Sequence, residues 1–165
     1  MHDIDFRRLL AAACAAARSF GAAMQVHTEK GQGVEALVEV LEAEGADPRR
    51  VILSHVDERP DLTLHLELAG LGYLLEYDTF LRPQYQPDEK LWPLFEGALE
   101  SGLTASIACG LDLADPAMWV FGGGEHGMAA LLTVVEPRLR SLGADRATLQ
   151  ALLRDNICNR VTLAA

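Results

Sequence analysis

Four short apolar runs, each followed by a segment with helical periodicity, most strongly constrain the fold of this chain. The runs lie at about residues 23–27, 51–55, 72–77 and 104–109. Strands that alternate with helices predict an α/β fold with a parallel sheet and right-handed crossovers. Four such βα units are half of a (β/α)8 barrel, which typically needs about 250 residues. The 165 residues are therefore expected to form a single domain, 1–165, with the architecture of a half-barrel.

The connecting segments carry apolar side chains at helical spacing. Residues 6–20 predict a helix that Gly21 ends, and the segments that begin at Val34, Asp88, Met128 and Leu149 predict four more. The segment after Pro60 is ambiguous, because Leu62, Leu64, Leu66 and Leu68 alternate with polar residues as in a half-buried strand. We favour a helix there, because Asp61 can cap it and the segment lies between two stronger strand candidates.

Charge and cysteine content exclude several classes of protein. The chain has 24 acidic and 14 basic residues, a formal net charge of −10, which argues against a nucleic-acid partner. Apolar stretches fall short of the roughly 20 residues of a membrane span. Three widely spaced cysteines without a Cys-x-x-Cys pair indicate neither a disulfide framework nor a cysteine zinc site. A reducing, cytoplasmic setting fits this pattern.

Three metal-ligating side chains follow the ends of predicted strands. They are His27, His55 and Asp112. Because sites in parallel sheets form at the carboxyl ends of the strands, we expect these residues to lie close together. Imidazole and carboxylate groups bind zinc and related divalent ions, and such an ion activates water for hydrolysis. Asp112 could also accept the proton of the attacking water. Taken singly, each histidine could instead be a hydrogen-bonded structural residue.

Further polar residues near these strand ends are weaker candidates for substrate binding. Asp78 ends the third strand and could orient a ligand, or could simply begin the loop. Arg82 could orient a polar or anionic substrate, or could be a solvated loop residue. His126 could line a pocket, although a position in water at the start of a helix fits it better. His2 and His65 are expected on the surface.

Five ordered segments resemble a known family. They are Val26-His27-Thr28, Arg50-Val51-Ile52-Leu53-Ser54-His55-Val56-Asp57, Gly72-Tyr73-Leu74-Leu75-Glu76-Tyr77-Asp78, Gly110-Leu111-Asp112 and Asp155-Asn156. From about residue 5 to 163 the chain resembles the second half of the phosphotriesterase-like metal-dependent hydrolases of the amidohydrolase superfamily. The fold that this resemblance implies is the second half of a TIM barrel.

The resemblance also implies an activity and assigns site residues. It implies a two-metal site, most simply zinc with manganese or cobalt as alternatives, that hydrolyses phosphotriesters, lactones or related small-molecule esters. His27 and His55 would bind one metal, and Asp112 would bind the other and handle the catalytic proton. The family's His-x-His on the first strand and its bridging lysine or glutamate on the fourth belong to a first half that this chain lacks.

Three hypotheses follow from these observations. In the first, the chain is one half of a metal-dependent hydrolase, completed by a partner chain or by a second copy in a homo-oligomer. In the second, it is a noncatalytic half-barrel that acts as a binding or assembly module. In the third, it is an unrelated small open α/β domain, which leaves the matched metal residues as coincidence.

Overall fold

The computed structural model describes residues 3–162 and contains one four-stranded parallel sheet. The strands are β1 (Met24–His27), β2 (Val51–Ser54), β3 (Leu74–Tyr77) and β4 (Ile107–Cys109). They lie in the sheet in the order in which they occur in the chain, and all three pairings are parallel. This arrangement confirms the predicted α/β fold with consecutive βα units.

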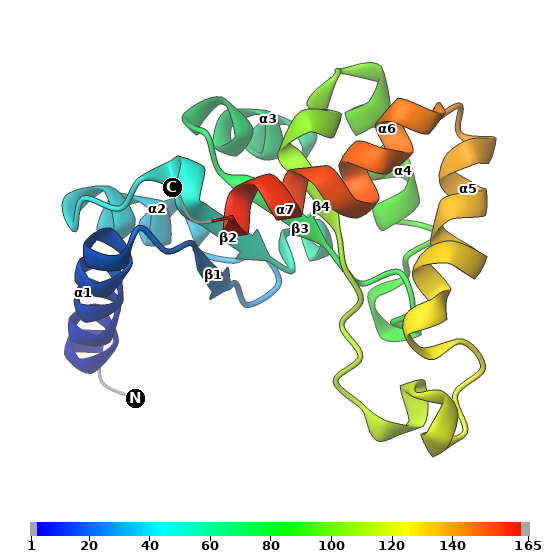
Figure 1. Cartoon of the computed structure of the whole chain (residues 1–165), viewed down its shortest axis with the longest axis horizontal. Coiled ribbons are helices and arrows are strands. Elements are labelled where there is room, and N and C mark those ends of the chain that lie inside the picture. The colour runs from blue at the N-terminus through cyan, green and yellow to red at the C-terminus, as the bar shows by residue number, and fades with distance from the viewer. Residues whose placement is uncertain (1–2, 163–165) are drawn as a thin grey trace.

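Helices connect the strands and continue after the last one. They are α1 (Asp3–Phe20), α2 (Val34–Ala43), α3 (Leu62–Leu71), α4 (Leu91–Glu100), α5 (Glu136–Ser141), α6 (Arg146–Gln150) and α7 (Asn156–Val161). Short π-helical stretches precede α5, at Leu131–Val135, and join α6 to α7, at Ala151–Asp155. Figure 1 shows α1 and α5 at opposite ends of the molecule, with the strands between them. None of the described helices is long and apolar enough to cross a membrane.

The ambiguous segment after Pro60 forms helix α3, as favoured from the sequence. The carboxylate of Asp61 caps the helix by accepting a hydrogen bond of 3.2 Å from the backbone nitrogen of Leu64. Gly72 ends it with φ of 103°, a left-handed conformation that glycine adopts without steric cost. Local capping at both ends therefore outweighs the alternating pattern of the leucines.

The fourth strand and the fourth helix both begin later than the sequence predicts. Residues Leu103–Ser106 form a 3-10 turn, so that only Ile107–Cys109 remains in β4. The carbonyl of Thr104 in this turn accepts a hydrogen bond from the Asn156 side chain instead of joining the sheet. Helix α4 begins at Leu91 rather than at Asp88, with Pro93 in its first turn, where a missing N–H group costs no hydrogen bond.

The two faces of the sheet pack against different parts of the chain. The main core lies on one face and includes Leu53, Leu75 and Tyr77, which are fully buried. Alternate residues of the strands point to the opposite, concave face, where Ile52, Leu74 and Ala108 pack with Ile157 of α7. Figure 1 shows α7 crossing in front of the strands. Helix α7 thus covers the lower, amino-terminal part of the concave face.

Hydrogen bonds hold α7 to the amino ends of three strands. Asn156 donates from its side-chain amide to the carbonyls of Thr104 and Ile107, each at 2.7 Å. Arg160 donates from one guanidinium nitrogen to the carbonyls of Pro48 at 2.9 Å and Gly72 at 2.8 Å. These four bonds satisfy backbone oxygens at the beginnings of β2, β3 and β4.

Candidate metal and hydrolytic site

His27 and His55 lie next to each other at the carboxyl edge of the sheet, as the strand-end rule predicts. Their ring centroids are 4.8 Å apart and the rings meet edge to face at 69°. His27 is the last residue of β1, and its side chain is 66% exposed. His55 follows β2 in a left-handed conformation with φ of 62°, and its side chain is only 18% exposed. One histidine of the pair is therefore fixed within the protein and the other is open to solvent.

The carboxylate of Asp78 fixes the ring of His55. Asp78 lies after β3, its side chain is 5% exposed, and its oxygens lie 2.9 Å from Nδ1 of His55. Because a carboxylate only accepts, Nδ1 donates, and Nε2 is the ring nitrogen left for another partner. The hydrogen bond with Asp78 raises the pKa of His55 to about 9, although burial opposes this, and the charges of Asp78 and Asp112 add to it. A ligand role for His55 requires loss of that second proton.

Asp112 forms an ion pair with Arg82 at the same edge. One guanidinium nitrogen of Arg82 lies 2.5 Å from the Asp112 carboxylate and 3.1 Å from its backbone carbonyl. The Asp112 nitrogen donates to the Asp78 carbonyl at 2.9 Å, which fixes Asp112 next to the His55 partner. Both side chains of the ion pair are largely buried, at 16% and 21% exposed. Arg82 thus positions the carboxylate that the sequence identified.

A second buried carboxylate, Asp57, lies behind His55. One of its oxygens accepts hydrogen bonds from the backbone nitrogen of Thr79, at 3.1 Å, and from the Thr79 hydroxyl. The other oxygen is buried and has no hydrogen-bond partner among the described residues. Burial raises the pKa of Asp57 well above its usual range, and the charge of Asp78 adds to the shift. Asp57 therefore supports the loop that carries Asp78. The sequence signal for this role is a carboxylate two residues after His55.

A polar layer on the concave face lies below the histidines. Gln25 donates from its amide to Ser54 at 3.0 Å and to Glu76 at 2.6 Å, and Ser54 donates to Glu76 at 2.6 Å. These residues alternate with core residues along β1, β2 and β3, so a period of two places Gln25 on the same face as His27. No motif in the sequence predicts this layer.

The described residues of the chain do not form a complete metal site. Among them, no three histidine, cysteine, aspartate or glutamate side chains converge at a spacing that could hold an ion. His27 and His55 fit one part of such a site, because they offer two adjacent imidazoles. The Asp112 carboxylate is engaged by Arg82 instead of joining them. This donor set therefore fits a partial site that needs further ligands.

Two hollows lie beside the remaining candidate residues. His27 lines one of about 430 Å³ together with Phe6 and Leu37, next to the outer edge of β1. His126 lines another of about 200 Å³ with Leu81 and Met118, and its ring lies 3.6 Å from the Glu125 carboxylate.

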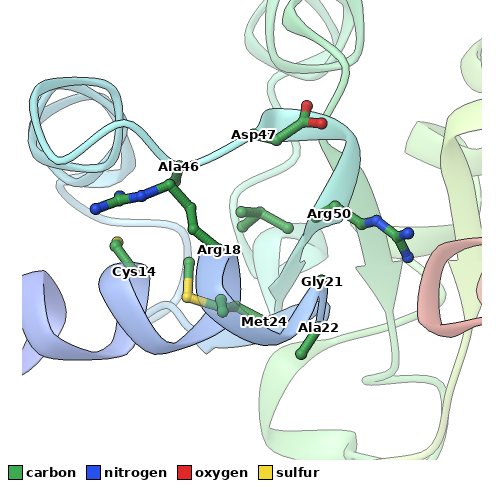
Figure 2. A pocket seen from close by; sticks show the side chains of 10 residues that line it. Cys14, Arg18, Gly21, Ala22, Met24, Ala46, Asp47 and Arg50 are labelled. Atoms are coloured by element: carbon green, nitrogen blue, oxygen red, sulfur yellow. The ribbon is translucent and has the colours of Figure 1, made fainter. Parts of the chain in front are cut away.

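A further cavity lies at the opposite end of the strands from the histidines. It has a volume of about 240 Å³, and Figure 2 shows Cys14 and Arg18 of α1 facing the loop that carries Ala46 and Asp47 across it. Met24, the first residue of β1, also lines it. This cavity is separated from the candidate site by the length of β1, and none of the expected site residues lines it.

Comparisons with known proteins match nearly the whole chain. Residues 3–160 match the model of the phosphotriesterase family. The phosphotriesterase homology protein of Escherichia coli is 30% identical over 150 residues, which are 90% of this chain and 51% of that protein. The N-acetyltaurine hydrolase of Rattus norvegicus is 29% identical, over 91% of this chain and 46% of that enzyme. The chain thus spans about half the length of the curated relatives it matches.

Solved structures agree with these matches. A crystal structure of the Escherichia coli protein with phosphate in its active site superimposes with a TM-score of 0.86 at 27% identity, over 93% of this chain and 52% of that one. A lactonase from Listeria monocytogenes superimposes with a TM-score of 0.88 at 20% identity, over 96% of this chain and 50% of the lactonase. At 20% identity, the similarity to the lactonase is a similarity of fold alone.

Proposed function

Because the chain belongs to the phosphotriesterase family, we propose that it forms one half of a divalent-metal-dependent hydrolase. Its substrate would be a small-molecule phosphotriester, lactone or related ester. The observation that carries this proposal is the meeting of His27 and His55, with rings 4.8 Å apart, at the edge of the sheet where Asp112 also lies. A relative of the chain is named as an N-acetyltaurine hydrolase, and solved structures of similar fold include a lactonase and a phosphotriesterase.

The residues of this half have separate tasks in the proposed site. His27 and His55 would hold one ion, most simply zinc with manganese or cobalt as alternatives, and Asp112 would bind a second ion. A divalent ion bound there supplies Lewis-acid polarisation of the ester and makes water more acidic. Asp112 would accept the proton of the attacking water. Asp78 would hold the His55 ring in position, and Arg82 would orient Asp112 or a polar group of the substrate.

The other half of the site would come from four further βα units. In this proposal they supply the ligands that His27 and His55 lack, and either a partner chain or a second copy could contribute them. Asp112 would have to exchange its ion pair with Arg82 for such an ion, because the guanidinium occupies its carboxylate in this structure. The activity therefore belongs to the assembled site.

The decisive experiment measures metal content and hydrolysis in the assembled protein. His27→Asn, His55→Asn and Asp112→Asn should each lower bound zinc, manganese or cobalt and abolish hydrolysis of a chromogenic ester and a lactone. Asp115→Asn is the matched control, because this carboxylate lies three residues after Asp112 but caps the nitrogen of Ala117 at 2.8 Å. Unchanged metal content and hydrolysis in all three site variants would exclude the proposal.

A noncatalytic assembly module is the second candidate function. Its support is the absence of a three-ligand cluster among the described residues, together with the engagement of Asp112 by Arg82. In that case the assembled protein would bind metal below one equivalent and would not hydrolyse esters, while its stability as a complex would be unaffected by His27→Asn.

A further inference from the structure

We propose that a hollow beside the candidate site, lined by both lysines of the chain, binds an anionic group of the substrate. The hollow has a volume of about 370 Å³ and is lined by Lys30, Glu58, Gln84, Tyr85 and Lys90. This inference rests on the proposed function, because it names the class of ester that the same site takes. A simple phosphotriester or lactone has no charged group, whereas this hollow selects an ester that also carries a carboxylate or a phosphate.

The hollow lies one step outward from the candidate residues, over the loops that follow the strands. Lys30 and Glu58 lie three residues after His27 and His55, and Tyr85 lies in the loop after β3. The backbone nitrogen of Glu58 donates to the carbonyl of His55 at 3.4 Å. Because the loops at the carboxyl ends of parallel strands surround the ligand, a group bound in the hollow belongs to a molecule that also reaches the histidines.

The two lysines are the strongest sign of an anionic ligand. They are the only lysines of the chain, they lie 60 residues apart in the sequence, and both line this hollow. Neither Lys30 nor Lys90 forms an ion pair among residues 3–162, although the chain has 24 acidic side chains against 14 basic ones. Two ammonium groups without a carboxylate partner create a local positive potential in an acidic protein, and such a potential attracts an anion.

Arg82 is not free to take that anion, because its guanidinium is fully engaged. One nitrogen binds Asp112, and the Gln84 amide oxygen accepts from Nε at 2.8 Å and from Nη2 at 3.2 Å, since a guanidinium only donates. This orientation leaves the Gln84 amide nitrogen as a donor beside the hollow. The ring of Tyr85 has the Arg82 carbon Cζ at 5.3 Å and the Lys30 nitrogen Nζ at 5.8 Å from its centroid. Tyr85 thus holds Lys30 near the candidate site through a cation–π contact.

The backbone around the hollow is held in an uncommon conformation. Lys30 has φ of 58° and Gln86 has φ of 54°, and the only other non-glycine residue with positive φ in the described part of the chain is His55. Gly31 packs so closely on Arg59 that a Cβ there would lie 2.8 Å from the Arg59 Cβ. The loop is therefore fixed by packing while Lys30 keeps a conformation that costs free energy, and such residues cluster at ligand sites.

Glu58 defines a second feature of the ligand. Its oxygen Oε2 is buried and has no hydrogen-bond partner among the described residues. Burial raises the pKa of this carboxyl group, and the charges of His55 and Lys30 oppose the shift. Two ammonium groups outnumber the one carboxylate, so the hollow still favours an anion. A hydroxyl or N–H group next to the anionic group of the ligand would satisfy the buried oxygen.

The test measures anion binding by the whole chain, without metal and without hydrolysis. Reductive methylation with isotope-labelled formaldehyde keeps the charge of the lysines and gives one NMR signal for Lys30 and one for Lys90. The probes are glutarate, inorganic phosphate and uncharged glutaramide, each added at constant ionic strength. Both lysine signals should shift along one saturating curve with glutarate or with phosphate, and neither should shift with glutaramide. The anion that binds more tightly identifies the charged group of the substrate.

Substitutions then assign the binding to the hollow. Lys30→Gln and Lys90→Gln should each weaken binding of the preferred anion about three- to tenfold, measured on the remaining lysine signal. Arg146→Gln is the matched control, because it removes one positive charge from an exposed side chain on α6 that lines no part of the hollow. This variant should bind the anion like the unaltered chain.

Two results would overturn the inference. One is a shift of the lysine signals that fails to saturate with both anions, and the other is an equal loss of affinity in Arg146→Gln and in the lysine variants. The proposed function is tested separately by metal content and hydrolysis. Saturable anion binding without bound metal would exclude the proposed function alone, and metal-dependent hydrolysis without anion binding would exclude the hollow alone.

Discussion

His65 makes the stability of this protein depend on pH in a way that a single substitution can isolate. The side chain is fully buried on α3, with 0% exposure. Its Nε2 lies 3.0 Å from the carbonyl of Arg59, which can only accept, so Nε2 carries the proton and Nδ1 accepts from the hydroxyl of Tyr77. A second proton on Nδ1 would displace the Tyr77 hydroxyl proton from its acceptor. Burial accordingly lowers the pKa of His65 from its usual 6.5 to about 4.

The sign and size of the effect follow from linkage. Between pH 6.5 and pH 4 the unfolded chain binds a proton at this histidine that the folded chain does not, so stability falls as the pH falls through this window. With about 1.36 kcal/mol for each pKa unit, the loss is about 2 kcal/mol at pH 5 and approaches about 3 kcal/mol at pH 4. Above pH 6.5 the histidine is neutral in both states, and its contribution is complete.

The assay compares urea unfolding of the unaltered chain with that of His65→Gln from pH 7.5 to pH 4.5. Glutamine does not titrate and keeps one donor and one acceptor, so the stability advantage of the unaltered chain should shrink by about 2 kcal/mol on reaching pH 5. Groups that titrate in both proteins cancel in this difference. His126→Gln retains His65 and should retain the full loss. A difference that changes by less than about 0.5 kcal/mol between pH 7.5 and pH 5 would refute the assignment of a neutral buried imidazole.

Three other substitutions test separate parts of the structure. Asn156→Ala removes both side-chain hydrogen bonds to the start of β4 and should lower the free energy of unfolding in urea by about 1–3 kcal/mol. Asn156→Asp should restore little of this stability, because its carboxylate lacks the donor amide. Gly110→Ala should destabilise the chain in a thermal melt, since a Cβ there would lie 2.6 Å from a carboxylate oxygen of Glu76, whose side chain Gln25 and Ser54 hold in place. The same change at Gly70, where nothing lies within 4 Å, would meet no such contact. Asp78→Asn should weaken zinc binding by the assembled site about 10–100-fold in a calorimetric titration, because it alters the carboxylate that orients the His55 ring. An unchanged zinc affinity would contradict this orienting role of Asp78.

The positions of the strand-end residues were predictable because they depend on topology alone. Parallel strands end at one edge of a sheet, so His27 and His55 had to meet once both runs were recognised as strands. The pairing of Asp112 with Arg82, 30 residues apart, depends on the path of a proline-containing loop, which no local pattern specifies. Whether these residues bind a metal remains a prediction.

The expectation that His65 is exposed is wrong, because the segment is a helix with 3.6 residues per turn and not a strand with a period of two. In a strand reading, His65 lies between leucines and points away from their face. In helix α3, Leu64, His65 and Leu68 share one face, and all three are buried. Apolar periodicity in α1 identified the helix correctly but could not show that Leu9 and Phe20 of the same stripe stay exposed, because periodicity does not specify which part of an apolar stripe a neighbouring element covers.

The bonds made by α7 also determine when the sheet can be completed during synthesis. Arg50, just before β2, donates hydrogen bonds to the carbonyls of Arg160 and Thr162, which lie 110 and 112 residues later in the chain. Contacts of such separation require a large loop to close and slow folding. While the ribosome still holds this helix, β2, β3 and β4 lack the partners at their amino ends and the apolar residues beneath them stay uncovered. The nascent sheet is therefore most prone to aggregation immediately before its last helix emerges.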